Sequence, residues 1–362
     1  MDIGHLFVRM AVVGICVGVA GCAKNVEPRL PKNTVLAAYS DGKAIAQSGV
    51  SKAFESVVSD QVAVLKKHFA QQKSALTNQF DHDFLRDYCG IAPERVTWSL
   101  VTVGPLTRRE KSKKPLIPLI AVVVHATLEK EAVLAQLNQR LAQKDDAGRL
   151  VAGELDGTPI WRLVHKDLSL ADGFAPCLAF IGKTMLVLAS HEDSLKEQLA
   201  LYAGKQPALG ADAALSQTIH LPKGVVSRMM IGDIQGLLQK VMTEEERKSA
   251  TETPYVATLM KTVQWTAIDV SLVEQPQAMD LVWRVGCADE QGAQAVNEML
   301  ITVRTSMKMG LGFIIKDKPN LKPVLTWLER INLRAAGKEA SLVIHATPDD
   351  VKNLDLVKLL DR

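Results

Sequence analysis

Short apolar runs separated by polar turns recur along the chain. The clearest is Leu119–His125, whose nearly continuous apolar character is typical of a strand buried on both faces. A glycine and a lysine at 182–183 predict a tight turn between two such runs. The pattern predicts strands at 34–39, 99–103, 119–125, 160–164, 177–181, 185–188, 225–231 and 266–273.

Apolar residues with helical spacing predict two helical regions in the first half of the chain. Phe54, Leu65, Phe69 and others favour a helix over about 44–88 with one break, ended by Cys89-Gly90 and Pro93. An amphipathic helix is expected at 129–144. Ser190 and Thr347 follow apolar runs and precede acidic residues, so both are predicted to be helix N-caps.

Similar short motifs occur twice along the chain, each before an apolar run. Leu30-Pro31-Lys32 and Leu221-Pro222-Lys223 each precede an apolar run, and Val96-Thr97-Trp98 and Val263-Gln264-Trp265 each lead into another. We interpret this as a duplication in an α+β chain of two related halves, each a mainly antiparallel sheet covered by helices on one face. The expected repeats are 30–204 and 221–362, joined by a linker at 205–220. Two unrelated α+β halves are the alternative.

The N-terminus predicts export. Met10–Gly21 carries no charge, and as a helix it would rise about 18 Å, well short of a hydrocarbon core of about 30 Å. Residues 1–21 therefore fit an export signal better than a membrane-spanning helix. The signal ends in Val19-Ala20-Gly21-Cys22, which resembles the lipobox of bacterial lipoproteins.

The lipobox resemblance implies that Cys22 is acylated and becomes the first residue of the mature protein, with 22–29 as a tether. Family analogy also associates the absence of aspartate after Cys22 with the outer membrane, at its periplasmic face, in a two-membrane bacterium. Otherwise the cell membrane is expected. The alternatives are a secretory signal with an incidental cysteine, or a buried core segment.

Composition excludes several classes of protein. The chain of 362 residues is 47% hydrophobic and 23% charged, with a net charge of +3, which excludes a disordered chain and a dedicated nucleic-acid binder. Besides Cys16 and Cys22 there are only Cys89, Cys177 and Cys287, so at most one disulfide is possible in the body. We expect buried thiols.

One strongly basic run is the main candidate contact site. It lies between Gly104-Pro105 and Pro115, a setting typical of a loop between strands. We hypothesise contact with anionic lipid head groups or another polyanion, and the alternative is a solvated hairpin loop. The cations are Arg108, Arg109, Lys111, Lys113 and Lys114.

Other conspicuous residues are interpreted as structural. His125 and His345 each begin a His-Ala-Thr tripeptide at a strand end, and we expect backbone groups to satisfy them. Asp81-His82-Asp83 is expected on a solvated helix face. Trp98 and Trp265 are interpreted as buried core residues, with a ligand groove as the alternative. Met229-Met230 and Met307/Met309 indicate either core filler or a soft binding face.

No nucleophile elbow, zinc-protease helix, P-loop or dinucleotide fingerprint occurs in the sequence. We therefore predict a non-catalytic, lipid-anchored binding or structural module of the cell envelope, with no cofactor, no metal and no nucleic acid. Its partner would be an envelope protein or an anionic lipid or polymer. The alternatives are a carrier of a lipid or other hydrophobic ligand, and an envelope hydrolase whose site is assembled from distant residues.

Overall fold

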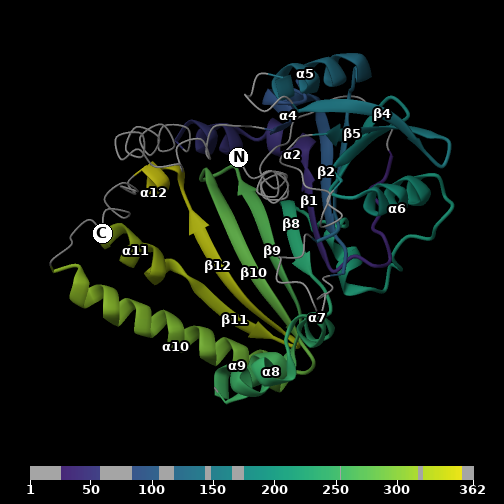
Figure 1. Cartoon of the computed structure of the whole chain (residues 1–362). Coiled ribbons are helices and arrows are strands. Elements are labelled where there is room, and N and C mark those ends of the chain that lie inside the picture. Colours follow the sequence, from purple (N-terminus) through teal and green to yellow (C-terminus); the bar gives the residue numbers. More distant parts are fainter. Residues whose placement is uncertain are drawn as a thin grey trace. The chain divides into compact units, whose positions relative to one another are not determined.

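The structure is a computed structural model that describes residues 26–57, 84–105, 118–142, 148–164, 175–252, 254–316 and 321–352. It is α+β and its sheet is antiparallel, as predicted (Figure 1). The chain divides into two compact units, each described here by itself. Unit 1 comprises Met1–Gln47, Asp83–Pro222 and Val226–Thr243, and unit 2 comprises Ser48–His82, Lys223–Val225 and Glu244–Arg362. The segment 205–220 therefore belongs to unit 1.

The strands of unit 1 pair antiparallel in the order β8-β1-β2-β3-β7-β6-β5-β4. Two of them, at 177–181 and 225–231, have the predicted bounds, and five others differ from prediction by a few residues at their ends, whereas the strand at 149–155 was not predicted. The strands are β1 (Leu36–Asp41), β2 (Val96–Val103), β3 (Ile120–Ala126), β4 (Arg149–Leu155), β5 (Thr158–Val164), β6 (Cys177–Ile181), β7 (Met185–Ala189) and β8 (Val225–Ile231).

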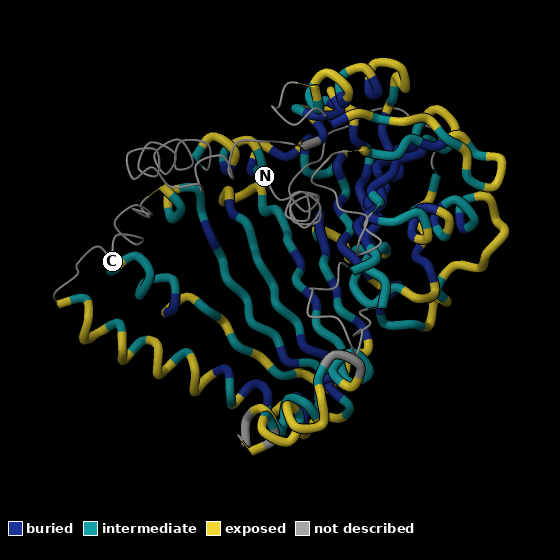
Figure 2. The backbone as a smooth tube through the Cα atoms, viewed as in Figure 1, coloured by how far each residue is buried: buried dark blue, intermediate teal, exposed yellow. Residues whose placement is uncertain are grey.

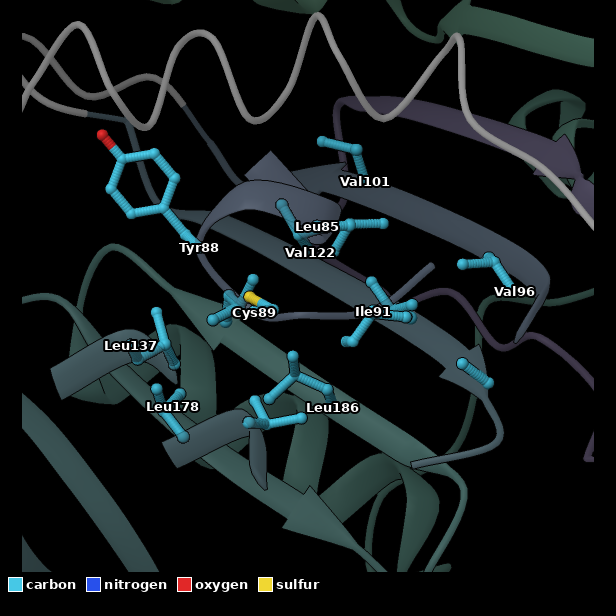
Figure 3. Close-up of a cluster of buried hydrophobic side chains, with 14 of the residues drawn as sticks. Leu85, Tyr88, Cys89, Ile91, Val96, Val101, Val122, Leu137, Leu178 and Leu186 are labelled. Atoms are coloured by element: carbon cyan, nitrogen blue, oxygen red, sulfur yellow. The ribbon is translucent and has the colours of Figure 1, made fainter. Parts of the chain in front are cut away.

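Helices cover both faces of the unit 1 sheet, so the expectation of a single covered face is wrong for this unit. Val101 and Thr102 are neighbours on β2 and point to opposite faces. Val101 lies in a core cluster with Leu85 of α4 (Phe84–Asp87) and Leu137 of α5 (Lys130–Ala142) (Figure 3). On the other face, Gln198 of α6 (Glu192–Tyr202) donates to Thr102 Oγ1 at 3.0 Å. Every residue of β3 is buried, so both faces need cover.

The long helix expected at 44–88 is observed only in part. The described residues are helical at Gly42–Gln47 (α2), at 49–57 and at Phe84–Asp87, and the stretch 58–83, including Asp81-His82-Asp83, lies outside them. The predicted stop is confirmed: Gly90 has φ +64°, and its N–H donates to the carbonyl of Arg86. The remaining elements of unit 1 are the 3₁₀ helices Pro93–Arg95 and Ala214–Thr218, and α7 (Ile234–Val241).

Ser190 does not cap a helix, contrary to the prediction. His191 is the N-cap of α6, and no side chain caps that end. The Ser190 hydroxyl instead donates to the carbonyl of Pro118 and accepts from the N–H of Ile120, at 3.1 and 2.9 Å. It therefore joins the end of β7 to the start of β3, which satisfies backbone groups that the sheet leaves unpaired.

Unit 2 contains an antiparallel sheet in the order β11-β12-β10-β9. Helix 49–57 packs on it through Val50 and Phe54, which contact Ala346, Leu272 and Met279. The strands are β9 (Val263–Val273), β10 (Ala278–Cys287), β11 (Asn332–Ala336) and β12 (Glu339–Ala346), and the helices are α8 (Glu244–Thr251), α9 (Pro254–Thr262), α10 (Glu290–Ile314), α11 (Lys322–Arg330) and α12 (Pro348–Lys352).

The predicted cap at Thr347 is confirmed. Its hydroxyl accepts from the N–H of Asp350, and the Asp350 carboxylate accepts from the N–H of Thr347 at 2.9 Å. This reciprocal arrangement is a capping box at the start of α12. Burial raises the pKa of Asp350, but hydrogen bonds from Thr347 and Arg330 outweigh it and lower the pKa below its usual value.

Register divides the unit 2 sheet into two chemically different faces. Asp280 lies opposite Ser271 on one side and His345 on the other, so these three side chains share a face. That polar face also carries Asp269, Arg284 and Glu339. The alternate positions form an apolar face, comprising Ile268, Val270, Leu272, Met279, Leu281, Trp283, Leu342 and Ile344.

The core cluster of unit 1 generates a stability prediction. Leu186 on β7 is fully buried in that cluster. We expect Leu186→Ala to reduce the free energy of unfolding by about 2–5 kcal/mol, because it removes buried methyl groups and leaves a cavity. Val164→Ala, at an exposed position of β5, is the control and should change it by less than about 0.5 kcal/mol. Urea unfolding followed by circular dichroism measures both, and equal effects would contradict the described packing.

Candidate functional site

The residues selected from the sequence as contact sites lie outside the described part of the chain. Cys22 precedes its first residue, Val26, and the basic residues Arg108, Arg109, Lys111, Lys113 and Lys114 lie in the stretch 106–117. The structure therefore places none of them. The strongest surface feature of the described residues is helix α10, of which only Met307 and Met309 were singled out from the sequence.

Helix α10 begins as a well-packed element of unit 2. Its N-cap Asp289 accepts from the N–H of Gly292 at 2.7 Å. A Cβ on Gly292 would lie 2.9 Å from the Cβ of Thr262, so the glycine allows close approach to the end of α9. Ala293, Val296 and Leu300 are buried along the same half of the helix. Packing thus fixes the N-terminal half of α10 to the rest of unit 2.

The second half of α10 exposes its apolar side chains. Nine large hydrophobic residues of the described chain are exposed, and six of them lie within 301–314, so they form a concentration and not a scatter. Phe313 is 71% exposed and Met309 is 62% exposed. Figure 2 shows exposed positions along much of this helix. At about 100° per residue, five of the six lie on one half of the helix circumference, and Ile301 lies outside it. We call these five residues the apolar face of α10: Val303, Met307, Met309, Phe313 and Ile314.

The two charged residues within 301–314 interact with unit 2 itself. The guanidinium of Arg304 donates to the carbonyl of Ile331 at 2.7 Å, after the end of α11. The ammonium of Lys308 lies 3.8 Å from the carboxylate of Glu329 on α11. No other residue of 301–314 carries a charge. The apolar face therefore combines exposure with the absence of charge, an arrangement that is unfavourable in water and suited to a partner that excludes water.

A histidine–aspartate pair occupies the polar face of the unit 2 sheet. His345 Nδ1 lies 2.6 Å from Asp280 Oδ1, so a carboxylate and not backbone satisfies this histidine, which corrects the expectation. Ser271 lies opposite Asp280 on the other neighbouring strand. Ser271 and His345 are two strand spacings apart, about 9.5 Å, which is too far for the histidine to act as base for this serine. The three residues do not form a catalytic triad.

A second polar cluster on that face stabilises the sheet. The Asp269 carboxylate is fully buried and lies 3.0 Å from the guanidinium of Arg284. Glu339 approaches the same guanidinium at 3.5 Å and is partly exposed. The three residues come from β9, β10 and β12, so the charges join three strands. Because Asp269 is buried, pairing is needed to offset the desolvation of its charge.

The two tryptophans singled out from the sequence are packing residues. Trp98 is 4% exposed, and its indole N–H donates to the carbonyl of Val26 at 3.0 Å. Its ring stacks on that of buried His125, with 5.3 Å between ring centroids. Trp265 lies against Gly286, where an added Cβ would overlap the indole. Trp98 is thus buried, as expected, whereas Trp265 packs against β10 but is only partly buried.

Nothing in the described residues assembles a metal or thiol centre. No group of three or more His, Cys, Asp or Glu side chains among them could hold a metal ion. Cys89, Cys177 and Cys287 are buried free thiols, as predicted. Burial raises the pKa of Cys177 to about 12 and also raises the pKa of Cys287, so both stay protonated at neutral pH.

The α10 surface had a partial signal in the sequence. Met307 and Met309 were interpreted as core filler or a soft binding face, and their exposure fits the second alternative. Ile301, Val303, Phe313 and Ile314 were missed. A usable signal was the stretch Met309–Ile315, which lacks charge and contains two glycines, an unusual composition for an exposed helix end.

The buried cluster generates a prediction with an internal control. We expect Asp269→Asn to destabilise unit 2 by about 2 kcal/mol, because it replaces the fully buried anionic partner of Arg284 by a neutral one, while the guanidinium itself is 32% exposed and keeps Glu339. Glu339→Gln removes the exposed contact to the same guanidinium and should cost less than about 1 kcal/mol. Urea unfolding of both variants provides the comparison. A Glu339→Gln effect equal to that of Asp269→Asn would contradict the assignment of the buried pair as the stabilising one.

Comparison with known proteins adds little. No protein-family model and no curated protein sequence matches the chain. A crystal structure of TP0453, in crystal form IV, is similar over 90% of this chain and 96% of that chain, with 7% sequence identity and a TM-score of 0.42. Among the described residues, no helix is long and apolar enough to cross a membrane.

Proposed function

We propose that the protein is a lipid-anchored component of the cell envelope whose body is a non-catalytic binding module. The observation that carries the binding role is the apolar face of α10, because five large apolar side chains are exposed on one side of one helix. An incidental exposed side chain needs no explanation, but a concentration of this kind is typical of an interaction site.

The proposed anchor is lipid on Cys22, supported by the lipobox Val19-Ala20-Gly21-Cys22. In a two-membrane bacterium the proposed place is the periplasmic face of the outer membrane. The basic residues Arg108, Arg109, Lys111, Lys113 and Lys114 would add a salt-dependent contact to anionic head groups. Because the lipid is covalently attached, it would keep the binding module beside the same membrane surface.

We also propose that the body arose by duplication. Leu30-Pro31-Lys32 precedes β1 and Leu221-Pro222-Lys223 precedes β8. The two Val-x-Trp tripeptides occupy the first three positions of β2 and β9. These matched positions support two related halves, each built around an antiparallel sheet.

A carrier of a hydrophobic ligand is the second candidate, favoured by the apolar face of the unit 2 sheet. Ile268, Leu281, Leu342 and Ile344 on that face are only partly buried. Such side chains could contact an acyl chain. Native mass spectrometry of the purified protein discriminates the two candidates, because a carrier would retain a stoichiometric lipid that is not covalently attached.

The anchor is tested by fractionation and intact mass of protein from its own cells, beside a Cys22→Ala variant. Wild-type protein should be found in the membrane fraction with acyl mass on Cys22, because two or three acyl chains give stable membrane attachment. The variant should be unprocessed or released.

Cys177→Ala, which removes a buried thiol, is the control and should fractionate as the wild type does. Soluble wild-type protein without acyl mass would contradict the lipoprotein assignment.

A further inference from the structure

We infer that the apolar face of α10 inserts into the surface of the lipid bilayer that carries the anchor, so the membrane itself is its partner. The inference rests on the proposed lipid anchoring at Cys22 and adds a second, protein-borne membrane contact. The described part of the chain contains no helix able to span a bilayer. Because α10 packs on unit 2 through Ala293, Val296 and Leu300, the contact we infer is that of a helix lying in the interface with one side in the acyl region.

The charges of this segment favour a lipid surface. Residues 301–316 contain Arg304, Lys308 and Lys316 and no acidic residue, so anionic lipids would not repel it. Arg304 and Lys308 contact Ile331 and Glu329 within unit 2, which leaves the apolar face uncharged. Lys316 is exposed immediately after the helix, where its ammonium can reach the head-group level.

The size of the face argues against a second protein as its occupant. About 14 helical residues extend about 21 Å, so the face covers about 200 Å² in projection, and its protruding side chains raise the accessible surface to about 500 Å². A stable protein interface needs about 800 Å² from each partner. A bilayer has no such threshold, because each apolar side chain that leaves water contributes separately.

The proposed anchor makes a small contact sufficient. A lipid on Cys22 holds the body beside the bilayer, so insertion of α10 becomes an intramolecular step at high effective concentration. A weak contact then stays occupied, although the same face alone would bind vesicles poorly. Insertion would shield Phe313 and Met309, the most exposed residues of the face, from water.

The experiment places a fluorescent probe on the full lipidated protein in phosphatidylcholine vesicles. The environment-sensitive probe NBD is attached at Phe313→Cys, since the native cysteines of the described body are buried. Lys338→Cys, in the exposed turn between β11 and β12 of the same unit, is the control. Bromine-labelled acyl chains should quench the probe at position 313 several-fold more than at 338, with a blue-shifted emission at 313 only.

Two further measurements sharpen the test: the salt dependence of the quenching, and the quenching in variants that carry an added aspartate. Quenching at position 313 should persist at raised salt, because the apolar face carries no charge, and should not fall in vesicles with added phosphatidylglycerol, because the segment carries no acidic residue. With the probe at Met309→Cys, adding Phe313→Asp should abolish the quenching, because a carboxylate cannot enter the acyl region without a large desolvation cost. Adding Val164→Asp, at an exposed position of unit 1, should leave it intact.

Three outcomes would overturn the inference: equal quenching at 313 and 338, loss of quenching at raised salt, or no effect of Phe313→Asp. Vesicle flotation of the same samples separates this failure from failure of the anchor. Protein that floats with the vesicles without quenching at 313 refutes insertion of α10 and leaves the lipid anchor standing. Protein that neither carries acyl mass nor floats refutes both, because α10 then has no anchor to assist it.

Discussion

The hydrogen bond from Arg304 to the carbonyl of Ile331 determines what unit 2 presents to its surroundings. It directs the guanidinium toward the body, where it satisfies a carbonyl beyond the end of α11. Lys308, four residues later, follows the same side toward Glu329. Because residues three or four apart lie on one side of a helix, both charges leave the remaining sides of the segment uncharged. Met309 and Phe313 lie on these uncharged sides, and both are exposed.

The two units bury their apolar residues to different extents. In unit 1 the central strand β3 is buried on both faces, with α4 and α5 on one side and α6 on the other. Unit 2 has a polar sheet face, where Asp269 and Arg284 form a buried pair, and an apolar face that remains partly accessible. Unit 1 thus has a conventional buried core, whereas unit 2 carries most of the exposed large apolar side chains of the described residues. This contrast is why the proposed binding role is assigned to unit 2.

Local pattern predicted most strands of unit 1 but missed the one at 149–155, and it predicted poorly which sheet faces helices cover. The run at 177–181 marked its strand correctly because a buried strand needs little more than consecutive apolar residues, and the strand at 225–231 was recognised from the apolar residues that flank Ser227 and Arg228. Ser190 was misassigned because its hydroxyl bonds to Pro118 and Ile120, about seventy residues earlier in the chain, which no local pattern reveals. The exposure of the apolar face of α10 was not predicted, for a related reason. Whether a methionine or a phenylalanine on a helix packs inward or faces solvent depends on the elements around it, and sequence periodicity shows only that such residues share a side.

The most direct test of the account is a spin-label scan of single cysteines from 302 to 314 in the lipidated protein on vesicles, which measures access to oxygen and to a water-soluble nickel complex. Oxygen partitions into the acyl region and the nickel complex stays in water. The account predicts that oxygen access varies with a helical period, is highest at Val303, Gly310 and Phe313 near the middle of the apolar face, and is low at Arg304 and Lys308. Uniformly high access to the nickel complex along the whole scan would contradict it.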